Sequence, residues 1–188
     1  MLSFIRRLFA KARNETGSAL WPYPLTGRGV QMMLFHAVRV ARVAAPAREA
    51  DMVRLLGPNP LEVRSRPSNH EPFMTPDDLG SFNLDRRLKL SAEFFLCLAP
   101  EAQKDPQGAE RKLVRHSIAS ISNRRDLNRM VQTMGPRQIV EFIRDSETGC
   151  GQSRAFVGKS WAAVAPDLPL PGCTAEICLC GNRAVIDF

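Results

Sequence analysis

Hydrophobic positions change their spacing several times along the 188-residue chain. Near the N-terminus, apolar residues recur at helical spacing between basic ones, at Leu2, Ile5, Leu8 and Phe9. This pattern predicts a short amphipathic helix. Prolines at positions 22 and 24 then indicate a linker, because proline disrupts a helix interior. Residues 1–29 are therefore interpreted as an amphipathic arm followed by a Pro-rich linker.

The chain becomes more apolar from residue 30 onward. In residues 30–45, Val38 and Val40 alternate with Arg39, which is typical of a strand. The methionines and alanines of the same run favour a helix, so the pattern leaves both structures open. A short helix is predicted over residues 47–56, ended by a Gly-Pro pair.

Helical signals return after a proline-rich loop over residues 57–80. Thr75 and Pro76 supply an N-cap and a first helical residue, and two acidic residues follow in the first turn. A further helix is predicted over residues 88–98 because apolar residues lie close together there and a proline follows at position 100.

The longest helical pattern covers residues 106–146. A Gly-Pro pair breaks it at 135–136, and a second helical stretch is expected over residues 137–144. The basic residues are expected on the face opposite the apolar stripe: Arg111, Lys112, Arg115, Arg124, Arg125 and Arg129. His116 is expected at the surface or at its boundary. Residues 30–146 thus form a mostly helical body.

The net charge of +7 is unevenly distributed. Residues 1–90 carry 14 basic and 8 acidic side chains, whereas the remainder is nearly balanced. A basic surface predicts contact with nucleic acid or with an acidic protein surface, although a solvated basic face is the alternative. The candidate contact residues are Arg6, Arg7, Arg39, Arg42, Arg64, Arg66, Arg86 and Arg87.

Residues 147–188 differ in character because they hold four of the five cysteines. The spacing is C-x22-C-x4-C-x-C, with glycines beside three of the cysteines, and little periodicity remains to build a core. Four thiolates around a zinc ion would stabilise such a module. An iron–sulfur cluster, a disulfide or redox pair, and plain packing remain open. The candidate ligands are Cys150, Cys173, Cys178 and Cys180, while Cys97 is expected in the core.

The cysteine segment resembles the C-terminal part of a group of small uncharacterised bacterial proteins. The shared features are a Cys, a Gly and an aromatic residue, then A-P-x-L-P-L-P-G-C-x4-C-x-C, which this chain carries over residues 150–180. The chain departs from the group after Cys180, since its tail has no histidine and one basic residue. The resemblance implies that the four cysteines act together, and it implies no activity.

No catalytic motif stands out. Gly158-Lys159-Ser160 resembles the end of a phosphate-binding loop, but Ser153 occupies the position of the first glycine. The three histidines are isolated in the sequence. The sequence therefore favours a binding protein over an enzyme.

These observations predict an α+β chain, mainly helical, with a small C-terminal Cys-rich module. The predicted function is a non-enzymatic binding protein with a structural metal module and a basic contact surface. Alternatives are an assembly subunit that docks through residues 1–15, and an iron–sulfur or redox protein. No apolar stretch approaches the ~20 residues of a membrane-spanning helix, and Arg6 and Arg7 interrupt any signal-peptide pattern. A cytoplasmic location is therefore expected.

Overall fold

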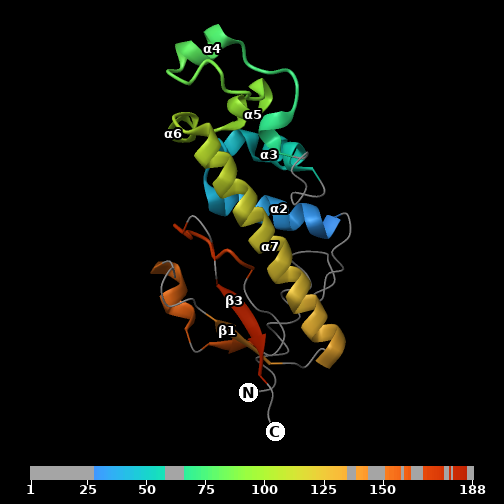
Figure 1. Cartoon of the computed structure of the whole chain (residues 1–188). Coiled ribbons are helices and arrows are strands. Elements are labelled where there is room, and N and C mark those ends of the chain that lie inside the picture. Colours follow the sequence, from blue (N-terminus) through green and yellow to red (C-terminus); the bar gives the residue numbers. More distant parts are fainter. Residues whose placement is uncertain are drawn as a thin grey trace.

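The computed structural model describes residues 28–57, 66–134, 139–143, 151–157, 159–161, 167–175, 178 and 180–185. Helices dominate this part of the chain, and a small antiparallel sheet accompanies them (Figure 1), so the predicted mainly helical α+β class is confirmed. The α-helices are α2 (Arg28–Ala41), α3 (Glu49–Leu56), α4 (Pro76–Ser81), α5 (Ala92–Cys97), α6 (Pro100–Gln103) and α7 (Pro106–Met134). The strands are β1 (Val140–Ile143), β2 (Ser160–Trp161) and β3 (Gly181–Ala184), and 3₁₀ helices are η1 (Pro46–Arg48), η3 (Pro67–Asn69) and η4 (Gly151–Phe156). The arm and linker predicted for residues 1–29 lie outside the described residues, apart from the first residues of α2.

The long helix α7 connects the two halves of the molecule. Its 29 residues span about 44 Å at 1.5 Å per residue. Helices α2 to α6 gather around its N-terminal part, and the sheet with the C-terminal segment lies beside its other half (Figure 1). Where α2 crosses α7, the Ser120 hydroxyl donates a hydrogen bond of 3.1 Å to the Met33 carbonyl. The small side chain of Ser120 therefore allows the two helices to approach closely.

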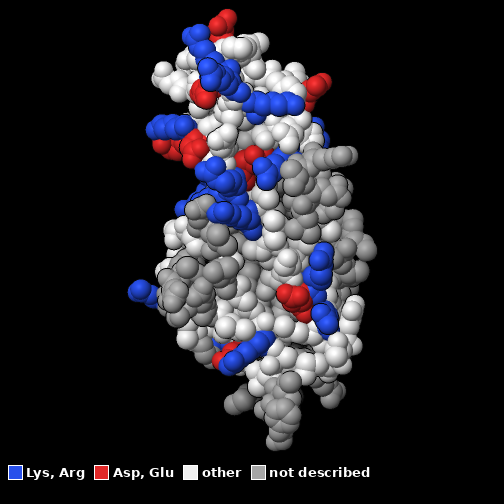
Figure 2. Space-filling view, viewed as in Figure 1, with Lys and Arg blue, Asp and Glu red and all other residues white. Residues whose placement is uncertain are grey.

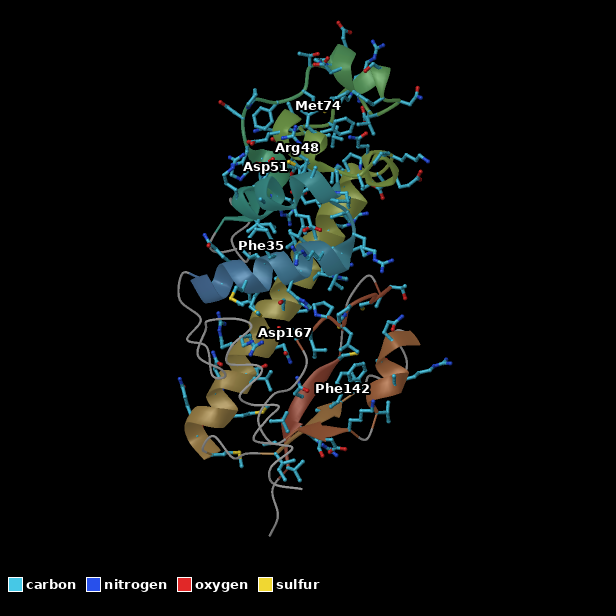
Figure 3. All side chains as sticks on the ribbon, turned by 180° about the vertical axis from the view of Figure 1, so that it is seen from behind. Phe35, Arg48, Asp51, Met74, Phe142 and Asp167 are labelled. Carbon is cyan, nitrogen blue, oxygen red and sulfur yellow. The ribbon has the colours of Figure 1, made fainter. Side chains whose placement is uncertain are left out.

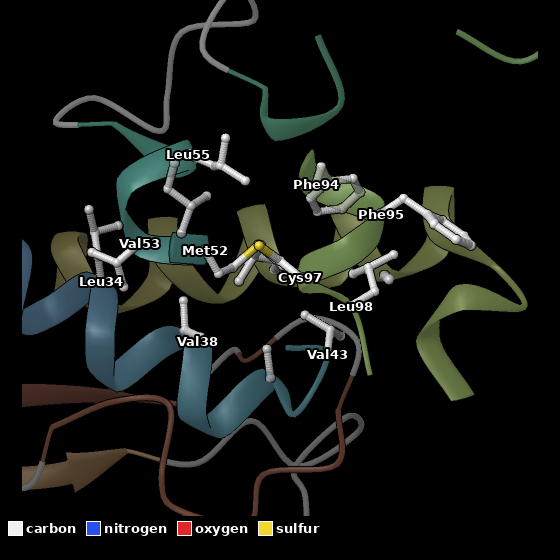
Figure 4. Packing of buried hydrophobic residues seen from close by; sticks show 14 of the residues in the cluster. Leu34, Val38, Val43, Met52, Val53, Leu55, Phe94, Phe95, Cys97 and Leu98 are labelled. Carbon is white, nitrogen blue, oxygen red and sulfur yellow. The ribbon is translucent and has the colours of Figure 1, made fainter. Parts of the chain in front are cut away.

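The main hydrophobic core lies between α2, α3, α5 and α7 (Figure 4). Leu34 and Val38 of α2 lie on one side of it, and Met52 of α3 lies opposite. Phe94 and Cys97 enter the core from α5. Full burial of side chains of this size contributes about 1.5–3 kcal/mol each, with the smaller thiol contributing less. The prediction of Cys97 as a core residue is confirmed, since it is 2% exposed.

The apolar run over residues 30–45 is largely helical. Its fully buried positions include Leu34, Ala37, Val38 and Ala41, which recur at intervals of three and four. This spacing places them on one face of α2, toward the core. The alternation of Val38, Arg39 and Val40 suggested a strand. It arises because α2 is buried on two sides, with Val38 in the main core and Val40 against the cysteine segment.

Two helix starts follow from their caps. The predicted N-cap at Thr75 is confirmed, because Thr75 and Asp78 form a reciprocal capping box at the start of α4. The helix predicted over residues 88–98 is shorter, and α5 covers only its second half. Ser91 sets this start, since its hydroxyl accepts a 3.3 Å hydrogen bond from the Phe94 backbone N–H.

The second helical stretch predicted over residues 137–144 is wrong. The described part of this stretch contains β1, the central strand of an antiparallel sheet ordered β2-β1-β3. Val140 and Phe142 are buried and Ile143 is exposed, which is the alternation of a half-buried strand. The strand forms because partners far along the chain supply its hydrogen bonds. Phe142 lies beside η4 (Figure 3), with its ring centroid 5.8 Å from that of Phe156.

Candidate thiol site

Three of the four predicted metal ligands come together in the C-terminal segment. Cys173 and Cys178 are 3% and 8% exposed, and Cys180 is half-buried. Cys173 and Cys178 lie in one buried cluster, and Cys180 packs against it. Contact with Cys173, then with Cys180, and burial raise the pKa of Cys178 far above the usual range. The described cysteines form no disulfide, and thiols must lose their protons before they bind a metal ion.

A tight turn carries Cys173 into the cluster. Gly172 has a φ of +79°, a conformation that glycine adopts without strain. The Cys173 backbone N–H donates a 2.9 Å hydrogen bond to the Leu170 carbonyl. The Gln152 side chain lies against this turn, 3.4 Å from where a Cβ on Gly172 would be. The turn therefore lies beside the start of η4.

The fourth predicted ligand, Cys150, lies outside the described residues. The residues that follow it, Gly151 and Gln152, begin η4, and Gln152 lies against the residue before Cys173. Among the described residues, no three His, Cys, Asp or Glu side chains are arranged so that they could hold a metal ion. Ligation by the three described thiols thus requires both deprotonation and reorientation of their side chains.

Two histidines fasten the C-terminal segment to the helical body. His116 of α7 is fully buried, and its Nε2 lies 2.9 Å from the Ala175 carbonyl oxygen. His36 of α2 makes the equivalent contact with the Pro169 carbonyl at 2.6 Å. Because a carbonyl oxygen only accepts, each Nε2 carries the proton. Burial lowers the pKa of His116, against the opposing effect of the Ala175 contact. The surface or boundary position expected for His116 is wrong.

A buried ion pair makes a third attachment. Arg124 of α7 pairs with Asp167, which lies beside that helix (Figure 3). The Arg124 side chain is 8% exposed, whereas that of Asp167 is 34% exposed. The expectation that Arg124 belongs to a solvated basic face is therefore wrong. The helix is covered on this side by the C-terminal segment, so a polar contact replaces water.

A small cleft separates α7 from the start of β3, and it reaches the thiols. Its volume is about 210 Å³. Ser122, Asn123 and Asp126 of α7 line one wall, and Cys178, Cys180 and Asn182 line the other. Neither the oxygen nor the nitrogen of the Asn182 side-chain amide has a hydrogen-bond partner in the described part of the chain.

The arginines predicted to form a contact surface lie on separate elements. Arg6, Arg7 and Arg64 are outside the described residues. The others are exposed, but Arg39 forms an ion pair with Glu49 at 2.9 Å. Figure 2 shows Lys and Arg side chains over the upper half of one face, with acidic side chains among them. The described members of the predicted set come from three parts of the chain: Arg39 and Arg42 at the end of α2, Arg66 before η3, and Arg86 and Arg87 after α4.

Sequence reasoning missed the polar residues that attach the C-terminal segment. A signal for His116 was present, since it follows the buried Leu113 by three residues and so lies near the apolar face of α7. No comparable signal existed for Asp167 or Asn182, because their environments depend on residues far away in the sequence.

Comparisons of the chain with protein-family models, curated proteins and solved structures found no match. Among the described helices, none combines the length and the apolar character needed to cross a membrane.

Proposed function

We propose that the protein is a non-enzymatic binding protein whose C-terminal module, residues 147–188, is organised by a metal ion. The observation that carries the proposal is the packing of Cys173, Cys178 and Cys180 in one cluster. Three thiols so close together are preferred ligands of zinc and of iron–sulfur clusters. Cys150 is proposed as the fourth ligand.

Zinc is the proposed ion because four thiolates match its tetrahedral preference and need no redox chemistry. The surroundings support a structural role. The buried cluster around Cys173 and Cys178 contains only one other buried hydrophobic residue in the described part of the chain, Val40 of α2. A second buried cluster, formed by Phe142, Leu168 and Leu170, packs another part of the module, so an ion would add rigidity chiefly around the thiols.

The test is the metal content of protein purified without oxygen. We expect about one zinc per chain and no visible absorption band. Cys178→Ala should lose the metal, because Cys178 is the central thiol. Cys97→Ala is the matched control, since this cysteine is buried in the helical core and touches no other described cysteine. Iron with a visible band would favour the cluster alternative, and metal-free wild-type protein would refute the proposal.

A basic contact surface is the second part of the proposed function. Arg42, Arg66, Arg86 and Arg87 are exposed, and none has a carboxylate within 4 Å among the described residues. Guanidinium groups of this kind are available to phosphates or to acidic side chains. We propose nucleic acid as the partner. Binding of duplex DNA should weaken steeply with salt, and no binding at ~50 mM salt would contradict this assignment and leave an acidic protein as the alternative.

A further inference from the structure

We propose that the cleft between α7 and β3 binds a guanine base, supplied by a free nucleoside or by an unpaired position of a nucleic acid strand. The inference goes beyond both parts of the proposed function, because it needs neither a metal ion nor the exposed arginines. It rests on the polar side chains that line the cleft, among them Asn123, Asp126 and Asn182. The described lining contains no basic side chain.

Asn182 is a polar residue on a sheet face that is otherwise apolar around it. It lies opposite Phe142 in the β1–β3 ladder, so both side chains project from the same face of the sheet. Phe142 packs in an apolar cluster. Val140, two residues earlier on β1, shares this face and packs against Leu127 of α7. The side chain of Asn182 is therefore directed toward α7 and the cleft.

The Asn182 amide lacks a partner for each of its polar atoms. The residue is 8% exposed, and neither its Oδ1 nor its Nδ2 has a hydrogen-bond partner in the described part of the chain. Buried polar groups are generally paired. A ligand that satisfies this amide must offer a donor to Oδ1 and an acceptor to Nδ2, side by side. The edges of nucleobases present such pairs of groups.

Asp126 selects among the bases. It is exposed, and it forms no ion pair with any described residue. Its carboxylate only accepts hydrogen bonds, so it favours a ligand with a further N–H donor. Adenine satisfies an asparagine amide, but guanine also carries an amino group beside its N1–H donor and its O6 acceptor. In the proposed complex Asn182 donates to O6 and accepts from N1–H, and Asp126 accepts from the amino group.

The volume and the other walls of the cleft suit a single flat ring system. Ala119, Cys178 and Cys180 contribute small, weakly polar surfaces that a ring can contact. Sites for whole drug-sized ligands measure about 300–1,000 Å³. The cleft, at about 210 Å³, is smaller, so it would take the base and leave the sugar outside.

The experiment measures the binding of guanosine by titration calorimetry, with adenosine and inosine as comparison ligands. Guanosine carries no phosphate, so the exposed arginines do not contribute. Inosine lacks only the amino group, and the protein should bind it about tenfold more weakly, because the lost hydrogen bond has a charged acceptor. Adenosine should also bind more weakly. Failure to bind guanosine, or equal binding of guanosine and either comparison ligand, would overturn the proposal.

Two variants assign the contacts. Asp126→Ala should bind guanosine and inosine equally, whereas Asp77→Ala, which removes an exposed carboxylate from α4, should keep the wild-type preference. Asn182→Leu should bind guanosine at least about tenfold more weakly. It should not lose stability in urea, because the amide has no partner in the described chain. A guanosine preference that survives in Asp126→Ala, or wild-type affinity in Asn182→Leu, would refute the site.

A single-stranded oligothymidine with one central guanine distinguishes the two sources of the base. Binding tighter than that of guanosine, and dependent on the guanine, assigns the base to a nucleic acid strand. Binding no tighter than that of guanosine assigns it to a free nucleoside. If guanosine does not bind, the base site alone is refuted, and the tests of metal content and of duplex DNA binding still decide the proposed function.

Discussion

The ion pair between Arg124 and Asp167 provides a quantitative test of how the C-terminal segment is attached to α7. Asp167→Asn preserves the shape of the side chain but removes the charge opposite a guanidinium that is 8% exposed. Two unit charges at roughly 4 Å attract by about 4 kcal/mol at an effective dielectric constant of 20. Because Asp167 is 34% exposed, water screens part of this attraction. We therefore expect the free energy of unfolding to fall by about 2 kcal/mol.

The assay is urea unfolding at pH 7, supported by thermal unfolding, in which the midpoint should fall by about 4–8 °C. Glu141→Gln is the matched control, because the Arg183–Glu141 pair at 2.8 Å has a carboxylate of similar exposure, 30%, but an arginine that is 64% exposed. Its loss should stay below about 0.5 kcal/mol. Equal, small losses in both variants would refute the reasoning, since the burial of Arg124 would then have no energetic consequence.

Other parts of the structure give further predictions. Leu113→Ala should lower the free energy of unfolding by about 3 kcal/mol in urea, because Leu113 is fully buried where α7 meets the core. Thr75→Ala should cost about 1 kcal/mol in the same assay by removing the N-cap of α4. Burial lowers the pKa of His116 in the folded protein. As the pH falls below about 6.5, the imidazole gains a proton first in the unfolded chain, so metal-free protein should lose stability. His116→Gln should remove this part of the pH dependence. Chelation of the proposed metal ion should leave the far-UV circular dichroism of the helices unchanged while hydrogen exchange increases at Cys173 and its neighbours. Loss of helix on chelation would contradict this.

Local patterns in the sequence were sufficient for the helices that have caps or a single apolar face. Thr75 and Asp78 form the capping box that their spacing indicates, and the start of α4 follows from it. The 30–45 run was ambiguous because α2 is buried on two sides, against the main core through Leu34 and against the cysteine segment through Val40. Periodicity alone does not distinguish such a helix from a buried strand.

The incorrect assignment of residues 137–144 has a different cause. The apolar residues from Ile139 to Ile143 fit a helix and a strand equally well over so short a stretch. The choice depends on hydrogen bonds to β2 and β3, and β3 lies some forty residues further along the chain. Long-range pairing of this kind leaves no trace in the local pattern.

The sequence predicted the cysteines of the candidate site but not the polar residues that lie beside them. The spacing of Cys173, Cys178 and Cys180 indicated that they meet, and these residues pack together in one cluster. The cleft beside them depends on Asp126 and Asn182, which come from elements that pack only in the folded chain. The sequence therefore pointed to the cysteines but gave no indication of the cleft or of the polar residues beside them.

The three polar attachments bear on how the proposed metal ion and the fold would depend on each other. Arg124 binds Asp167, and the rings of His36 and His116 bind the carbonyls of Pro169 and Ala175. These contacts surround Cys173 in the sequence, so the helical body already positions this thiol before an ion arrives. A segment attached in this way needs less backbone ordering on binding than a zinc finger, which folds around its metal, although its thiols still have to reorient. Loss of the proposed ion should therefore leave these three attachments in place.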